Sequence, residues 1–214
     1  MSDTTRVAGT RLPAPGLYAV TPDEADTARL IAQVTQVVAG RPALLQYRSK
    51  LDSAAVREAQ ARAILAICRS AGVPLIINDD LRLALAIGAD GVHLGRDDGD
   101  PAQARAALGA TGIVGVTCYD EWARAQAGVM AGADYVAFGA MFVSPTKPHA
   151  VRAPLALLRR ARLELGVPVA AIGGITLDNV DAVIAAGADF PAVISDVFLA
   201  SDPAARVRSF AAKF

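Results

Sequence analysis

The chain has 214 residues, 53% of them hydrophobic and 20% charged, with 21 basic and 21 acidic side chains. This composition excludes a disordered chain and a nucleic-acid binder that depends on excess positive charge. The two cysteines lie far apart, and no apolar run approaches the roughly 20 residues of a membrane-spanning helix. We therefore expect a cytoplasmic protein that binds neither nucleic acid nor a membrane.

Eight short apolar runs alternate with longer segments of helical character. A polar first segment, residues 1–15, precedes them, and we expect it to be a flexible tail. In chain order the runs are 17–21, 43–48, 74–78, 91–94, 113–117, 135–139, 167–172 and 192–195. They are nearly continuous in aliphatic residues, which is typical of strands covered on both faces. Between the runs, Asp52-Ser53 begins a helix that Gly72 ends, and Thr176 begins another that Gly187 ends.

Eight strand–helix units without a linker predict one α/β domain over residues 16–214. Its expected architecture is a (β/α)8 TIM barrel, with an open doubly wound sheet as the alternative. A Gly-Ala-Asp triplet recurs at 88–90, 132–134 and 187–189, before the fourth, sixth and eighth runs. A glycine that ends a helix and an aspartate that enters a strand suit the loops of such a barrel.

Polar residues collect at the ends of the runs, where the active site of a barrel lies. The second run ends in Gln46, Arg48 and Lys50, which alternate along the strand and therefore point to the same side. An arginine and a lysine that converge suit the oxygens of a phosphate or diphosphate. The alternative is that both cations lie in a solvated loop.

Carboxylates follow the third and fourth runs, which are neighbours in the predicted barrel. Asp79 follows the third run, and Asp97 and Asp98 follow the fourth. Mg²⁺ is usually held by one or two carboxylates together with substrate phosphates, so the pattern suits a magnesium site. The alternative is helix capping, by Asp79 or Asp80 before one helix and by Asp98 before the next.

Three further features belong to the predicted mouth of the barrel. Gly173 and Gly174 end the seventh run and Ser195 ends the eighth, where barrels often bind phosphate through backbone N–H groups, although a tight turn also explains the glycines. The loop at 140–150 exceeds the usual length of about 2–6 residues and suits a lid. His93 either touches the ligand or is a hydrogen-bonded core histidine.

Together these motifs resemble the thiamine-phosphate synthase (thiamine-phosphate pyrophosphorylase) family. The resemblance runs in order from residue 17 to residue 195 and rests on Gln46-x-Arg48-x-Lys50, Asn78-Asp79-Asp80, residues 88–95, Ser144-Pro145-Thr146-Lys147 and Gly173-Gly174-Ile175. It implies a (β/α)8 barrel that joins 4-amino-2-methyl-5-hydroxymethylpyrimidine diphosphate to a thiazole phosphate, giving thiamine phosphate and pyrophosphate. The implied mechanism is a Mg²⁺-assisted dissociative substitution without a protein nucleophile.

The resemblance also assigns roles to individual positions. Asp79 and Asp98 are implied to hold Mg²⁺, and the implied catalytic cations are Arg48, Lys50 and Lys147. The positions implied to bind the pyrimidine diphosphate are Gln46, Arg48, Lys50, Asn78, Thr117 and Lys147. Those implied to bind the thiazole phosphate are Ser144, Pro145, Thr146, Gly174, Ile194 and Ser195.

Two alternatives to this transferase stay open. A thiazole tautomerase has the same barrel without the diphosphate site, and the presence of Gln46, Arg48 and Lys50 argues against it. A phosphate-binding barrel without turnover is the other, because Phe190-Pro191 departs from the family's usual pattern beside the implied phosphate site. The partners expected in each case are phosphorylated small molecules, and nothing in the pattern predicts an oligomeric state.

Overall fold

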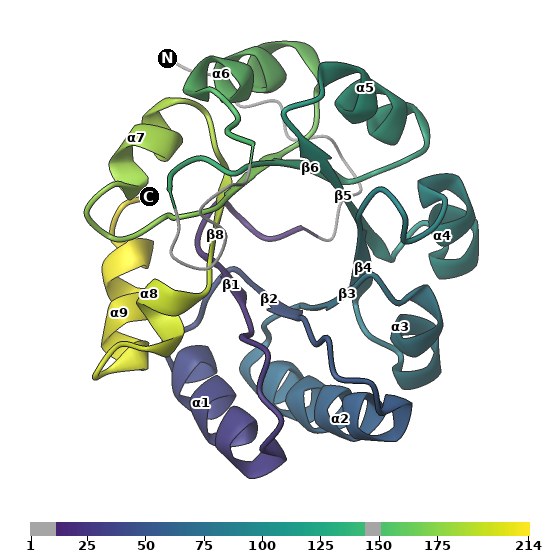
Figure 1. Cartoon of the computed structure of the whole chain (residues 1–214), viewed down its shortest axis with the longest axis vertical. Coiled ribbons are helices and arrows are strands. Elements are labelled where there is room, and N and C mark those ends of the chain that lie inside the picture. The colour runs from purple at the N-terminus through teal and green to yellow at the C-terminus, as the bar shows by residue number, and fades with distance from the viewer. Residues whose placement is uncertain (1–11, 144–150) are drawn as a thin grey trace.

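In a computed structural model of the chain, which describes residues 12–143 and 151–214, eight parallel strands close into a barrel surrounded by helices (Figure 1). The strands pair in chain order, and the last pairs with the first, which confirms the (β/α)8 barrel over the open sheet. They are β1 (Tyr18–Val20), β2 (Leu44–Tyr47), β3 (Leu75–Asn78), β4 (Gly91–Leu94), β5 (Ile113–Tyr119), β6 (Tyr135–Phe138), β7 (Val169–Ile172) and β8 (Phe190–Val193).

The helices of the described residues cover the outside of this barrel. They are α1 (Thr27–Ala39), α2 (Ala54–Ala71), α3 (Leu81–Ile87), α4 (Pro101–Leu108), α5 (Trp122–Met130), α6 (Leu155–Glu164), α7 (Val180–Ala185), α8 (Ser195–Phe198) and α9 (Pro203–Ala211). In residues 12–143 and 151–214, none of them combines the length and the apolar composition of a membrane span.

Helix ends largely follow the capping residues of the sequence. Ser53 caps α2 by accepting the Val56 N–H, and Gly72 ends the helix with a φ of 69°. The predicted start of α7 is wrong by several residues, because its N-cap is Asn179 and not Thr176. Thr176 lies in a turn instead, and its N–H donates to the Asn179 side chain at 2.9 Å.

The three Gly-Ala-Asp triplets enter β4, β6 and β8 as predicted. In each, the aspartate accepts a backbone N–H near the start of the preceding strand; the pairs are Asp90 with Leu75, Asp134 with Val114, and Asp189 with Val169. These bonds join neighbouring strands at the end of the barrel opposite the carboxyl ends. The triplet therefore has a structural role, and its aspartates do not belong to the mouth of the barrel.

The core has two parts. The larger part packs between the strands and the helices. The smaller part fills the inside of the barrel and consists of Leu12, Tyr18, Val20, Leu44, Ile76, Ile113, Tyr135, Ala137, Ala170, Phe190 and Ala192. Its first member, at 8% exposure, comes from the segment expected to be a tail, of which residues 1–11 lie outside the described part of the chain.

The eighth strand begins earlier than the sequence predicts. The predicted run is 192–195, and proline is rare in a buried strand. Pro191 nevertheless lies within β8, opposite Ala171 of β7. Phe190 before it packs edge-on against Tyr135 inside the barrel, with ring centroids 6.4 Å apart. The buried packing of Phe190 accompanies the loss of one strand-to-strand hydrogen bond, because proline has no backbone N–H. Since the strand begins and ends earlier than predicted, Ser195 is the first residue of α8 and not a strand residue.

Candidate active site

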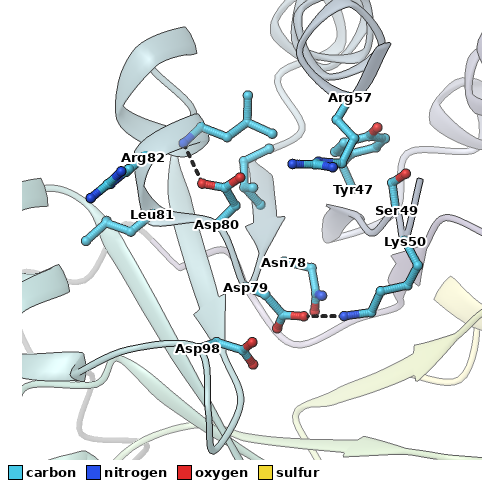
Figure 2. A pocket seen from close by; sticks show the side chains of 12 residues that line it. Tyr47, Ser49, Lys50, Arg57, Asn78, Asp79, Asp80, Leu81, Arg82 and Asp98 are labelled. Atoms are coloured by element: carbon cyan, nitrogen blue, oxygen red, sulfur yellow. Dashed lines mark hydrogen bonds and ion pairs between the residues drawn. The ribbon is translucent and has the colours of Figure 1, made fainter. Parts of the chain in front are cut away.

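The carboxyl ends of β2 and β3, the first turns of α2 and α3, and Asp98 after β4 line a cavity of about 470 Å³ (Figure 2). Four residues that the sequence predicts for the site, Lys50, Asn78, Asp79 and Asp98, line it. In barrels of this class the active site lies at this end of the strands, with residues from several strands contributing. The structure therefore brings one predicted cation, Lys50, together with the two predicted carboxylates, whereas Arg48 does not line this cavity.

Asp79 directly follows β3 and has an unusual backbone conformation. Its φ is 64°, in the left-handed region that few residues other than glycine adopt. Its N–H donates to the carbonyl oxygen of His93 at 2.8 Å. Its carboxylate Oδ2 lies 2.8 Å from the Lys50 ammonium, and Figure 2 shows Asp79 between Lys50 and Asp98. Strain of this kind is often found at functional sites, and here it turns the carboxylate toward the cavity.

The structure shows which of the aspartates after β3 and β4 cap a helix. Asp80 is the N-cap of α3 and accepts the Leu83 N–H, and Asp100 is the N-cap of α4. Asp79 and Asp98 cap neither helix. Both carboxylates therefore remain at the mouth, where a cation can reach them.

Asp79 and Asp98 lie in contact with each other. Burial, a hydrogen bond with Asp79 and the charge of Asp79 raise the pKa of Asp98, against the opposing effects of the Gly95 N–H and the Lys50 ammonium. The Gly95 N–H donates to Asp98 Oδ2 at 3.0 Å, which orients the carboxylate. Two adjacent carboxylates that disfavour each other's charge are stabilised by a divalent cation.

The donor set fits Mg²⁺ bound together with a substrate. In residues 12–143 and 151–214, no cluster of three or more His, Cys, Asp or Glu side chains forms. Asp79 and Asp98 alone would leave most of an octahedral shell to other oxygens. Phosphate oxygens and water are the usual remaining ligands of Mg²⁺, so this pair suits a metal that arrives with a phosphorylated substrate.

The repulsion between the two carboxylates predicts an effect on stability. Because the folded state raises the pKa of Asp98, it holds more protons than the unfolded state between the ordinary and the raised pKa. The free energy of unfolding of the metal-free protein therefore falls as the pH rises through this interval. Asp98→Asn removes this fall, and we expect its Tm at neutral pH in EDTA to exceed that of the unmodified protein by about 2 °C.

Thermal unfolding of both proteins across pH, in EDTA and in Mg²⁺, measures this effect. Mg²⁺ should raise the Tm of the unmodified protein and leave the Asp98→Asn variant nearly unchanged. A variant that is less stable than the unmodified protein in EDTA at neutral pH would show that the two carboxylates do not repel each other.

An aspartate that the sequence analysis did not single out holds the cations of β2. Asp23, after β1, accepts from Arg48 Nη1 at 2.7 Å and from the Lys50 N–H at 2.6 Å. Thr21 Oγ1 accepts the Arg48 N–H at 2.9 Å and donates to the Arg48 carbonyl oxygen at 3.0 Å. The only sequence signal for Asp23 is an acidic residue shortly after the first run, and the β1–β2 pairing is needed to place it.

Replacing Asp23 with asparagine tests whether this contact positions the two cations. We expect kcat/KM for a diphosphate substrate to fall about tenfold, because a hydrogen bond between charged groups is lost. Glu24→Gln is the matched control, since Glu24 pairs with Arg29 instead, and it should change kcat/KM by less than about twofold. Steady-state kinetics in which the two variants lose the same activity would contradict this role.

Gln46 and Thr117 are placed deeper than the cations. Gln46 is 5% exposed, and its Nε2 donates to the Tyr18 hydroxyl at 2.7 Å. Thr117 Oγ1 lies 2.6 Å from His93 Nε2. Burial lowers the pKa of His93 to about 4, although Asp79 acts in the opposite direction. The interpretation of His93 as a hydrogen-bonded core histidine is therefore confirmed.

The glycines after β7 lie against the loop that follows β6. Gly174 has a φ of 65°, and a Cβ there would approach the Val143 carbonyl oxygen to 2.6 Å. The Phe142 N–H donates to the Gly173 carbonyl oxygen at 2.9 Å. Glycine is thus required at Gly174 both by the left-handed turn and by the close approach of a second loop.

The remaining predicted positions lie at α8 or outside the described residues. Ile194 is the N-cap of α8, and Ser195 is its first residue. The first N–H groups of a helix have no partner within the helix, and such groups suit an oxyanion. Four predicted positions in the loop after β6 lie outside the described residues: Ser144, Pro145, Thr146 and Lys147.

Comparison with known proteins identifies the family of this barrel. A family model described as thiamine monophosphate synthase matches residues 17–197. The chain belongs to the thiamine monophosphate synthase family. Thiamine-phosphate synthase from Azoarcus sp. (strain BH72) is 64% identical over 199 residues, which are 93% of this chain and 97% of that protein. The corresponding protein from Methylobacillus flagellatus is 56% identical over 198 residues, covering 92% and 94% of the two chains.

Solved structures agree with this family. Thiamine phosphate pyrophosphorylase from Pyrococcus furiosus matches with a TM-score of 0.81 at 28% identity, over 92% of this chain and 94% of that one. A 3-hexulose-6-phosphate synthase matches with a TM-score of 0.69 at 21% identity, over 92% and 99% of the chains, and shares the fold alone. Membership of the thiamine monophosphate synthase family makes the chain an enzyme of the transferase class that acts in thiamine biosynthesis.

Proposed function

We propose that this chain joins 4-amino-2-methyl-5-hydroxymethylpyrimidine diphosphate to a thiazole phosphate and releases pyrophosphate. The observation that carries the proposal is the cavity at the ends of β2 and β3, which Asp98 after β4 also lines. There the Lys50 ammonium lies 2.8 Å from Asp79, and Asp98 lies against Asp79. A metal-bound diphosphate needs cations for its oxygens and carboxylates for its metal, and this cavity offers both.

The proposed cofactor is Mg²⁺, held by Asp79 and Asp98. When bound, it would neutralise charge that develops on the departing pyrophosphate. In the structure, the Lys50 ammonium pairs with Asp79 Oδ2, so Lys50 neutralises one of the two carboxylates that would hold the metal. The proposal therefore includes a change of partner, in which Lys50 leaves Asp79 for the diphosphate when the metal and the substrate enter.

The side chains of this enzyme would act by binding and orientation. Arg48 and Lys50 bind diphosphate oxygens, and Asn78, Gln46 and Thr117 orient the pyrimidine. The bond between the pyrimidine methylene carbon and the diphosphate oxygen breaks, and its electron pair leaves with pyrophosphate. The thiazole nitrogen then donates its lone pair to that carbon, so no protein nucleophile is needed. Charge stabilisation and positioning are the contributions that remain for the protein.

Incubation of the purified protein with both substrates and Mg²⁺ tests the proposal. Thiamine phosphate and pyrophosphate should form in equal amounts, and neither should form when one substrate is omitted. Isomerisation of the thiazole without condensation would favour the tautomerase, and binding of both substrates without product would favour a binding barrel. Either outcome would overturn the proposed condensation.

A further inference from the structure

Five polar side chains inside the barrel form one continuous chain of hydrogen bonds. Gln46 Nε2 donates to Tyr18 at 2.7 Å, and the hydroxyls of Tyr18 and Tyr135 lie 2.7 Å apart. The Tyr135 hydroxyl lies 2.9 Å from His93 Nδ1, and His93 Nε2 lies 2.6 Å from Thr117 Oγ1. This hydrogen-bond chain therefore crosses the barrel interior from Gln46 on β2 to Thr117 on β5. Its two ends are residues for which the proposed function predicts contact with the substrate.

The three central side chains of this hydrogen-bond chain are buried inside the barrel. Tyr18 is 1% exposed, Tyr135 is fully buried and His93 is 6% exposed. The rings of His93 and Tyr135 also stack, with centroids 5.5 Å apart and an interplanar angle of 21°. These three side chains are therefore shielded from bulk solvent, and their polar atoms bond to their neighbours in the hydrogen-bond chain.

With the Gln46 amide nitrogen directed at Tyr18, as in the structure, the hydrogen bonds that follow can all be satisfied in one direction. An amide nitrogen only donates, so the Tyr18 oxygen accepts from Gln46, and the Tyr18 proton is directed to Tyr135. The Tyr135 proton is then directed to His93 Nδ1. A buried neutral imidazole that accepts a hydrogen bond at Nδ1 carries its proton on Nε2. This Nε2–H then donates a hydrogen bond to Thr117 Oγ1.

We propose that Tyr18, Tyr135 and His93 are positioning residues that fix which end of the chain accepts and which end donates. Because its Nε2 is used inside the barrel, Gln46 offers the carbonyl oxygen Oε1 toward the mouth. Because its oxygen accepts a hydrogen bond from His93 Nε2–H, the Thr117 hydroxyl can donate its own O–H toward the mouth.

This arrangement selects a ligand by its pattern of donors and acceptors. A ligand must present a donor to Gln46, such as the amino group of an aminopyrimidine, and an acceptor to Thr117, such as a ring nitrogen or a phosphate oxygen. The identity of the ligand rests on the proposed function. The direction of the hydrogen-bond chain rests only on the contacts inside the barrel, and the two can be tested separately.

The histidine tautomer tests the direction without any measurement of activity. The protein contains two histidines, His93 and His149, so ¹⁵N NMR of a His149→Ala variant reports one imidazole. We expect the neutral ring with its proton on Nε2. In Tyr135→Phe, which removes the donor to Nδ1, the second tautomer should become populated. A proton on Nδ1 in the protein with intact Tyr135 would overturn the proposal.

Kinetics test whether the chain positions the substrate contacts. Tyr135→Phe should raise KM for the pyrimidine diphosphate about tenfold, as expected for one disrupted buried hydrogen bond, and should change KM for the thiazole phosphate less than about twofold. Ile113→Val is the control, because Ile113 belongs to the same inner core and has no polar side-chain atom. It should lower stability without changing the ratio of the two KM values.

The outcomes separate positioning from structural support. Equal changes in both KM values, or the same ratio in Tyr135→Phe as in Ile113→Val, would overturn the positioning role. If Tyr135→Phe does not fold, Tyr18→Phe interrupts the chain one step earlier and takes its place. Failure of the unmodified protein to form thiamine phosphate would refute the proposed function, while the NMR result would still decide the direction of the chain.

Discussion

Asp79→Asn is expected to lower kcat by about 10³-fold or more, even at saturating Mg²⁺, because a proposed metal ligand and its charge are removed from the developing pyrophosphate. The substitution preserves the shape of the side chain, and asparagine tolerates the left-handed backbone of this position better than most residues. The fold should therefore remain intact. The Mg²⁺-dependent rise in Tm should disappear in the same variant, since the proposed site loses half of its carboxylates.

Asp80→Asn is the matched control for this result. Asp80 is the next residue along the chain and serves as the N-cap of α3, a role that asparagine fills equally well. Its kcat should stay within about twofold of the unmodified protein, because Asp80 lines the same cavity but its carboxylate is used to cap α3, a bond that asparagine keeps. Single-turnover measurements at several Mg²⁺ concentrations distinguish the two variants. Normal turnover in Asp79→Asn would refute the metal assignment.

Arg48→Ala is expected to lower kcat/KM for the pyrimidine diphosphate by about 10²–10³-fold, the effect of losing one preorganised donor to a developing negative charge. Arg48→Lys should lose about tenfold, because a lysine retains the charge but not the planar fork. Arg48 uses Nη1 for Asp23 at 2.7 Å, and a guanidinium has further N–H groups for the ligand. A lysine cannot reproduce this geometry.

A surface arginine provides the control for Arg48. Arg62 lies on α2 and pairs with Glu58 one helical turn away, so Arg62→Ala removes a cation of the same type outside the mouth. Its kcat/KM should change by less than about twofold. The separate KM values should show the Arg48 effect on the diphosphate substrate and not on the thiazole phosphate. Equal losses for both substrates would contradict a specific contact between Arg48 and the diphosphate.

Most strands and helices of the barrel are predicted by the local sequence, and the elements that were placed wrongly have physical explanations. Continuous apolar runs predict the strands, because both faces of each strand are covered. The start of β8 was predicted too late, since the packing of Phe190 on Tyr135 arises only when the strands close into a barrel. Asp79 and Asp80 are adjacent acids after one strand, and only the φ of 64° at Asp79 separates a cavity carboxylate from a helix cap.

The supporting residues of the site were not predictable in the same way. Tyr18 and Tyr135 are 117 residues apart, and each is indistinguishable in sequence from an aromatic that fills a core. Their hydroxyls meet only because the strands close into a barrel. Asp23 similarly becomes informative once β1 pairs with β2 and its carboxylate reaches Arg48. Most of the residues proposed to contact a ligand lie at or just after strand ends, whereas the residues that hold them depend on closure of the barrel.

The most direct test of the proposed site is a crystal structure of the protein with inorganic pyrophosphate and Mn²⁺, a cation that takes the same oxygen ligands as Mg²⁺ and has an anomalous signal. We predict an anomalous peak between the carboxylates of Asp79 and Asp98, at about 2.0–2.3 Å from an oxygen of each. The pyrophosphate should contact Arg48 and Lys50, with Lys50 moved away from Asp79. A metal peak away from this pair, or pyrophosphate bound without either cation, would contradict the proposed site.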